Sequence, residues 1–165
     1  MGGKIRLLIV DDEIKFIDSI AARLEMRGLD VTKAYDGKDA VELARREKFD
    51  LALLDLKMPG MDGREVLQIL KQENEHIEAV ILTGHGSLES AVECTKLGAW
   101  GYLPKPYELD DLLEVLKDAY HARLTKKLTS RHEGIARVMA QAEGQSALGV
   151  LRALRELDDD ETYSR

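Results

Sequence analysis

Short apolar runs alternate with amphipathic stretches along the first 120 residues, and this alternation constrains the fold more than any other feature of the sequence. The apolar runs are Lys4–Val10, Leu29–Ala34, Leu51–Leu54, Ala79–Leu82 and Trp100–Leu103. Most of them are continuously apolar, which is typical of strands buried on both faces of a parallel sheet. The stretches between them carry apolar residues at helical spacing, as in Ile14, Ile17, Ala21 and Leu24. The pattern therefore predicts five β-strands that alternate with helices.

Five strand–helix units in about 120 residues predict a doubly wound α/β fold with a five-stranded parallel sheet. We expect strand order 2-1-3-4-5, with the strands numbered along the chain. Gly28 and Gly98 follow the first and fourth amphipathic stretches, where helices commonly end in a left-handed residue. We assign residues 1–122 to this domain. Residues 123–165 are expected to form a short helical C-terminal extension that cannot bury an independent core.

Charge and hydropathy limit the classes of partner. Residues 1–120 contain 16 Lys and Arg against 24 Asp and Glu, whereas residues 121–165 contain 8 against 7. The acidic body makes nucleic acid an unfavourable partner, because nucleic acid binding requires a basic face. No segment has the roughly 18 to 20 consecutive apolar residues of a membrane span, and the first residues lack an apolar signal region. We therefore expect a cytoplasmic protein without a membrane partner.

Polar residues follow the apolar runs at the positions where a parallel sheet binds its ligands. Asp11 and Asp12 follow the first run, Asp55 the third, Thr83 the fourth and Lys105 the fifth. Ligands bind beyond the carboxyl ends of the strands in such sheets. With strands one and three as neighbours, the three carboxylates lie side by side and require a cation. Oxygen ligands in an incomplete cage suit Mg²⁺.

The same residues predict a phosphoryl acceptor. A carboxylate can attack a phosphoryl group when cations neutralise the repulsion between the two anions. Asp55 is the predicted nucleophile because it has the central position. Lys105 would pair with one phosphoryl oxygen and the Thr83 hydroxyl would bind another. Gly84 leaves room for the incoming group.

Four motifs carry a resemblance to a known family. They are LIVDDE at residues 8–13, LLDLKMPGMDG at 53–63, ILTGHG at 81–86 and GAWGYLPKP at 98–106. In this order, over roughly residues 4–120, the chain resembles the response-regulator receiver domains of bacterial two-component signalling. The resemblance implies a flavodoxin-like, CheY-like fold.

The resemblance also implies a function for each site residue. Asp55 would accept the phosphoryl group from a phosphohistidine of a sensor histidine kinase. Asp11, Asp12 and Asp55 would hold Mg²⁺ together with the backbone carbonyl of Lys57, and Lys105 and Thr83 would contact the phosphoryl group. The chain would be a phosphoacceptor signalling protein, not an enzyme, that assists its own phosphorylation and slow dephosphorylation.

A conformational switch follows from the same resemblance. Thr83 would move toward the phosphoryl oxygen and Tyr102 would swing inward behind it. The surface built from residues 87–97, strand five and the helix from residue 108 would then change for dimerisation or partner binding.

Lys57 and His85, each two positions after a site residue, would slow hydrolysis of the acyl phosphate. The peptide bond between Lys105 and Pro106 is expected to be cis.

Other α/β proteins with phosphate chemistry fit the motifs less well. A phosphatase of the haloacid-dehalogenase type needs an Asp-x-Asp nucleophile motif on the first strand, where this chain has Asp11-Asp12. A flavodoxin needs a hydroxyl- and glycine-rich loop there, and Asp11-Asp12-Glu13 would repel a phosphate. A degenerate receiver that acts without phosphorylation stays open as an alternative.

The C-terminal extension leaves two alternatives. Leu124 and Leu128 continue the helical spacing past the domain, and the sequence at 130–133 has the capping-box pattern that predicts the start of a second helix. Gly144 would end that helix, and a third would span 147–157. We favour a homodimer or partner docking through these helices. The alternative is a DNA-binding regulator with a reduced helix-turn-helix in the extension, although the usual third helix is missing.

Overall fold

The structure is a computed structural model that describes residues 3–84, 87–141, 144 and 146–153. Contacts divide the chain into two compact units, Met1–Arg123 and Leu124–Arg165, which are considered separately. Within the described part of the chain, no helix has both the length and the apolar character of a membrane span.

The first unit contains one parallel five-stranded sheet with the order β2-β1-β3-β4-β5. Its strands are β1 (Arg6–Val10), β2 (Asp30–Ala34), β3 (Leu51–Leu54), β4 (Glu78–Thr83) and β5 (Gly101–Pro104). The predicted fold and strand order are confirmed. The strand bounds differ from the predicted ones by two residues or fewer, the largest difference being that β1 begins at Arg6 and not at Lys4.

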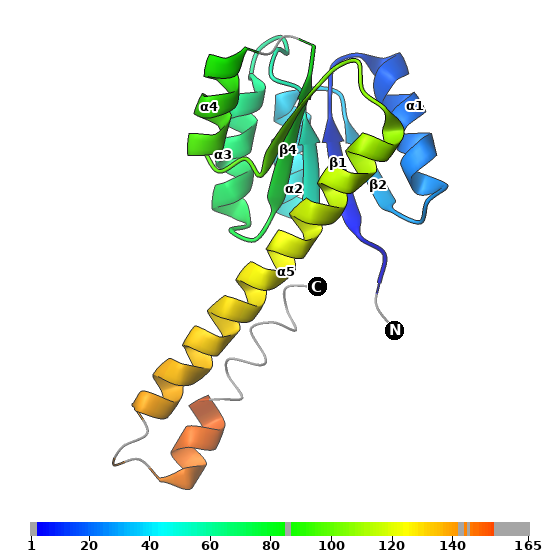
Figure 1. Ribbon diagram of the computed structural model, residues 1–165. Coiled ribbons are helices and arrows are strands. Elements are labelled where there is room, and N and C mark those ends of the chain that lie inside the picture. The colour runs from blue at the N-terminus through cyan, green and yellow to red at the C-terminus, as the bar shows by residue number, and fades with distance from the viewer. Residues whose placement is uncertain (1–2, 85–86, 142–143, 145, 154–165) are drawn as a thin grey trace. The chain divides into compact units, whose positions relative to one another are not determined.

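Helices cover both faces of the sheet, with α1 and α5 on one side and α2, α3 and α4 on the other (Figure 1). They are α1 (Ile14–Glu25), α2 (Gly37–Arg46), α3 (Gly63–Glu73), α4 (Leu88–Lys96) and α5 (Leu109–Ala140). Leu7 and Ile9 of β1 pack on the α1–α5 side, while Leu8 and Val10 pack on the opposite side. Since successive strand residues face opposite ways, burial of both faces explains why the apolar runs are continuous.

Capping residues and glycines mark where several helices begin and end. The side chain of Asp62 accepts hydrogen bonds from the backbone N–H groups of Arg64 (2.9 Å) and Glu65 (3.2 Å), so α3 begins eight residues after Asp55. Gly28 and Gly98 have φ angles of 90° and 99° and lie just after α1 and α4, as predicted. The Asp62 cap thereby fixes the end of the loop that carries Asp55 at the carboxyl edge of the sheet, whereas the two glycines precede β2 and β5 at the amino edge.

Helix α5 is continuous from Leu109 to Ala140, so the prediction that a second helix starts at Ser130 is wrong. A capping box starts a helix only where the preceding backbone leaves helical geometry, and residues 121–129 contain no glycine or proline that would interrupt it. Residues 147–153 are also helical. The remainder of the predicted third helix, residues 154–157, lies outside the described residues.

An ion pair between Arg123 and Asp50 connects α5 to the amino end of β3. Arg123 Nη2 lies 3.0 Å from Asp50 Oδ1, and the two side chains are only 9% and 24% exposed. The other Asp50 oxygen, Oδ2, accepts a hydrogen bond of 2.9 Å from the backbone N–H of Arg6. Asp50 therefore joins α5 to the beginnings of β1 and β3.

We expect Arg123→Met to lower the free energy of unfolding by about 3 kcal/mol, because it leaves the half-buried Asp50 carboxylate without its cation. Thermal and urea unfolding would measure the loss. Lys117→Met on the same helix is the matched control, because Lys117 pairs with Glu114 in solvent (side chains 65% and 67% exposed) and should change little. Equal effects of the two substitutions would contradict the anchoring function of Arg123.

Candidate functional site

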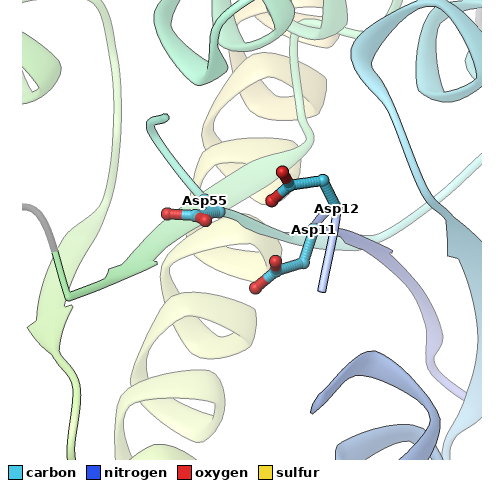
Figure 2. A group of neighbouring side chains, drawn as sticks. All are labelled: Asp11, Asp12 and Asp55. Carbon is cyan, nitrogen blue, oxygen red and sulfur yellow. The ribbon is translucent and has the colours of Figure 1, made fainter. Parts of the chain in front are cut away.

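The carboxyl ends of the strands bring the predicted site residues to one edge of the sheet. Asp11 directly follows β1, Asp55 directly follows β3, Thr83 is the last residue of β4 and Lys105 directly follows β5. The side chains of Asp11, Asp12 and Asp55 each offer an oxygen, and these oxygens lie within 4.8 Å of one another. Figure 2 shows the three carboxyl groups side by side.

The three carboxylates differ in their surroundings. Asp11 and Asp55 are buried (2% and 3% exposed), whereas Asp12 is exposed. Asp11 Oδ1 accepts a hydrogen bond of 2.9 Å from the backbone N–H of Glu13, and Asp11 Oδ2 pairs with Lys105 Nζ at 2.8 Å. Asp11 is thus a buried carboxylate with a cation beside it.

Asp55 has less compensation for its burial. The Thr83 hydroxyl donates a hydrogen bond to its carboxylate. Asp55 Oδ1 is buried and has no hydrogen-bond partner among the groups that the structure describes. A buried carboxylate oxygen that accepts no hydrogen bond calls for another positive partner. Together with the two neighbouring carboxylates it offers the oxygen ligands that a hard divalent cation such as Mg²⁺ requires. The residues present therefore fit a magnesium ion.

Burial raises the pKa of Asp55 above its usual range. The hydrogen bond from Thr83 opposes this rise, the negative charge of Asp11 adds to it, and the positive charge of Lys105 opposes it. Burial outweighs the favourable contacts, so the folded protein without a metal disfavours the ionised form of Asp55.

This shift predicts that Asp55→Asn stabilises the metal-free protein near neutral pH. A carboxyl group with a raised pKa in the folded state contributes its stability below the unfolded pKa and loses it as the pH rises through the folded pKa. The asparagine variant should therefore melt at a higher temperature than the wild type at neutral pH. The difference should shrink as the pH falls through the raised pKa of Asp55 and the carboxylate takes up a proton. Thermal unfolding in a chelator between about pH 4 and 8 measures it, and a difference that grows on acidification would contradict the assignment.

Lys105 reaches the site from β5. The Lys105–Pro106 peptide bond is cis, as the family resemblance implied. The Lys105 side chain is 15% exposed, and its ammonium also lies 3.9 Å from Glu13 Oε1. On its α1 side, Nζ lies 3.8 Å from the centre of the Phe16 ring. Phe16 is not among the residues predicted from the sequence, where its position four residues after Asp12, one turn into a helix, is its only signal.

Three further residues were predicted for the site, namely Lys57, Tyr102 and His85. Lys57 is exposed in the loop after β3, and its function as a backbone ligand or a tuning residue stays a prediction. Tyr102 is half-buried and packs against the core under α4. Its hydroxyl is buried with no hydrogen-bond partner in the described part of the chain, and burial raises its pKa. His85 lies outside the described residues.

A parallel sheet of this order with these groups at its carboxyl edge defines the class of protein. The family model described as "Response regulator receiver domain" matches residues 7–117. The chain belongs to this family of signalling proteins.

Relatives and a solved structure agree. The transcriptional regulatory protein ZraR of Salmonella typhimurium is 42% identical over 124 residues, which are 74% of this chain and 28% of ZraR. The sporulation initiation phosphotransferase F of Bacillus subtilis is 34% identical over 112 residues, 68% of this chain and 90% of that protein. A response regulator from Burkholderia pseudomallei, solved with a phosphorylated aspartic acid, a calcium ion and citrate, has a TM-score of 0.67 and 29% identity, and covers 92% of this chain and 93% of its own.

Proposed function

We propose that the chain accepts a phosphoryl group on Asp55 from a phosphohistidine of a sensor histidine kinase. The observation that carries this proposal is the buried Asp55 carboxylate, which has an oxygen without a hydrogen-bond partner in the described structure and lies within 4.8 Å of the carboxylate oxygens of Asp11 and Asp12. A group of negative charges buried in this way is costly unless it binds a cation. Mg²⁺ would be held by Asp11, Asp12, Asp55 and the backbone carbonyl of Lys57.

The transfer exchanges one bond to phosphorus for another. A carboxylate oxygen of Asp55 attacks phosphorus and forms the O–P bond of an acyl phosphate, while the bond from phosphorus to the imidazole nitrogen of the donor breaks. The imidazole keeps the electron pair and takes up a proton. When bound, Mg²⁺ would supply positive charge that offsets the repulsion between the Asp55 carboxylate and the negatively charged phosphoryl group.

The side chains around Asp55 account for the rest of the proposed chemistry. Lys105 lies within reach of Asp11 and would shift its ammonium to a phosphoryl oxygen. Thr83 already donates to Asp55 and would donate to a second phosphoryl oxygen instead. Lys105 and Thr83 would thus hold the phosphoryl group in place. The protein would thereby assist its own phosphorylation and slow dephosphorylation.

The relatives support a phosphoacceptor but leave the output open. The name of the Bacillus subtilis relative describes a phosphotransferase, and the Burkholderia pseudomallei structure holds a phosphorylated aspartic acid and a calcium ion. ZraR is named as a transcriptional regulatory protein, but this chain spans only 28% of its length. The predicted helix-turn-helix has its turn at residues 143–145, of which only Gly144 is described, so we do not extend DNA binding to this chain.

We further propose that phosphorylation is reported by the surface of α4, β5 and the first turns of α5, through Thr83 and Tyr102. Large apolar side chains are exposed on this surface, among them Leu88 (83%), Val92 (47%) and Trp100 (43%). Such a surface suits a protein partner or a second copy of the chain. We retain residues 1–122 as the receiver domain, residues 123–165 as an extension for dimerisation or docking, and the cytoplasm as the location.

Binding of beryllofluoride, a phosphoryl analogue, tests the proposed site. With Mg²⁺ present, the full chain should bind it with a stoichiometry of one, measured by calorimetry and by fluorine NMR. Asp55→Asn should abolish binding, and Asp118→Asn, on the surface of α5, is the matched control and should leave it unchanged. Binding that persists without the Asp55 carboxylate would overturn the proposal.

A further inference from the structure

The ring of Phe16 lies against the ammonium group of Lys105. Lys105 Nζ lies over the ring at 3.8 Å from its centre and 2.8 Å from Asp11 Oδ2, so the ammonium is held between a carboxylate and an aromatic face. The face of an aromatic ring carries partial negative charge and attracts cations, more strongly where water is excluded. With only 15% of the Lys105 side chain exposed, this contact is largely shielded from water.

The ring of Phe16 also has packing contacts that do not involve the lysine. Phe16 packs against the core between α1 and α5, and its ring makes an edge-to-face contact with Tyr107 at 6.3 Å and 86°. Phe16, Tyr107 and Lys105 line one groove of about 460 Å³ together with Ile20 and Arg23. Contacts with the core and with Tyr107 therefore support the ring, whereas the lysine's own charge partner is Asp11.

Resting on the proposed function above, we propose that Phe16 is a positioning residue that keeps the Lys105 ammonium at the phosphorylation site when a metal ion occupies Asp11. Asp11 is the close anionic partner of Lys105, since Glu13 lies at 3.9 Å and is 61% exposed. A cation bound to Asp11 shares its negative charge and weakens the ion pair with Lys105. Mg²⁺ would bind the oxygen ligands and not the Phe16 ring. The attraction between the ring and the Lys105 ammonium therefore persists when the metal is bound.

Two variants separate this positioning from simple packing. Phe16→Leu keeps an apolar side chain of similar reach but removes the aromatic face, whereas Phe16→Trp keeps an aromatic face. Leu109→Ala, at another apolar position of the same groove, is the matched control. All three are compared with the wild type in the full chain, after circular dichroism has established that each is folded.

The first measurement is the proton NMR shift of the Lys105 ε-methylene group, without and with Mg²⁺. Protons over an aromatic face are shifted upfield, so the wild type and the tryptophan variant should show an upfield signal that persists when Mg²⁺ is added. The leucine variant should lose it. A wild-type signal at its ordinary position, or one that moves there on Mg²⁺ addition, would overturn the proposal whatever the activity.

The second measurement is the rate of phosphorylation by acetyl phosphate at saturating Mg²⁺, which involves no kinase. Phe16→Leu should be slower by about three- to tenfold, while Phe16→Trp and Leu109→Ala should stay within about twofold of the wild type. A leucine variant that reacts at the wild-type rate with acetyl phosphate overturns the positioning function, even if a kinase phosphorylates it slowly. A wild type that takes no phosphoryl group refutes the proposed function itself, and the NMR shift still reports on the ring contact.

Discussion

Replacing Gly63 with alanine is expected to lower the free energy of unfolding by about 3 kcal/mol or more. A Cβ at this position would overlap the backbone oxygen of Asp55, and it would lie 2.9 Å from both the Asp55 carbonyl carbon and the Leu56 Cα. None of these atoms belongs to a flexible side chain. The Gly63 N–H also donates a hydrogen bond of 2.9 Å to the Leu56 carbonyl, so α3 begins directly against the segment that carries Asp55.

Thermal unfolding should show this cost as a fall of about 6–12 °C in the melting temperature of the Gly63→Ala protein. The displaced backbone should also slow phosphorylation of Asp55. Gly84→Ala is the matched control for stability, because its Cβ would have Lys105 Cβ as its nearest neighbour, at 3.9 Å. An unchanged melting temperature for Gly63→Ala would show that α3 does not pack against the Asp55 backbone in this way.

Asp12→Asn is expected to raise the Mg²⁺ concentration required for half-maximal phosphorylation by about a hundredfold. Losing even an indirect partner of a metal ligand commonly weakens metal binding by about 10- to 100-fold, and Asp12 is a proposed direct ligand. Because Asp12 is exposed, the substitution should leave the fold intact. Phosphorylation by acetyl phosphate across a Mg²⁺ titration measures the effect, and a chelator should stop the reaction in the wild type.

Glu13→Gln is the control for the general effect of negative charge on metal attraction. Glu13 is a neighbouring carboxylate that is 61% exposed and lies outside the group of three. Its substitution should change the Mg²⁺ requirement only slightly. Equal shifts for the Asp12 and Glu13 variants would mean that the site attracts the ion by its overall charge and that Asp12 is not a ligand.

The sheet and the grouping of the site residues could be predicted from the sequence because both depend on local patterns. Continuous apolar runs identify buried strands, and the order of the strands places the residues after β1 and β3 side by side. Asp11 and Asp55 are 44 positions apart, but each needs only its own strand to be located.

Other features depend on how side chains from distant elements pack, which no local pattern encodes. Phe16 of α1 lies against Lys105, which follows β5, and Arg123 of α5 pairs with Asp50, which precedes β3. Gly63 resembles any glycine at a helix start until the Asp55 backbone is placed beside it. The capping pattern at Ser130 gave a wrong prediction because Ser130 lies inside the continuous helix α5, where no helix begins.

The most direct test is the mass of the full chain after incubation with acetyl phosphate and Mg²⁺, followed by mapping of the modified peptide. We predict the addition of one phosphoryl group, located on the peptide that carries Asp55, and no addition in Asp55→Asn or in the presence of a chelator. A wild-type chain that gains no phosphoryl group, or gains one that persists in Asp55→Asn, would contradict the assignment of Asp55 as the phosphoacceptor.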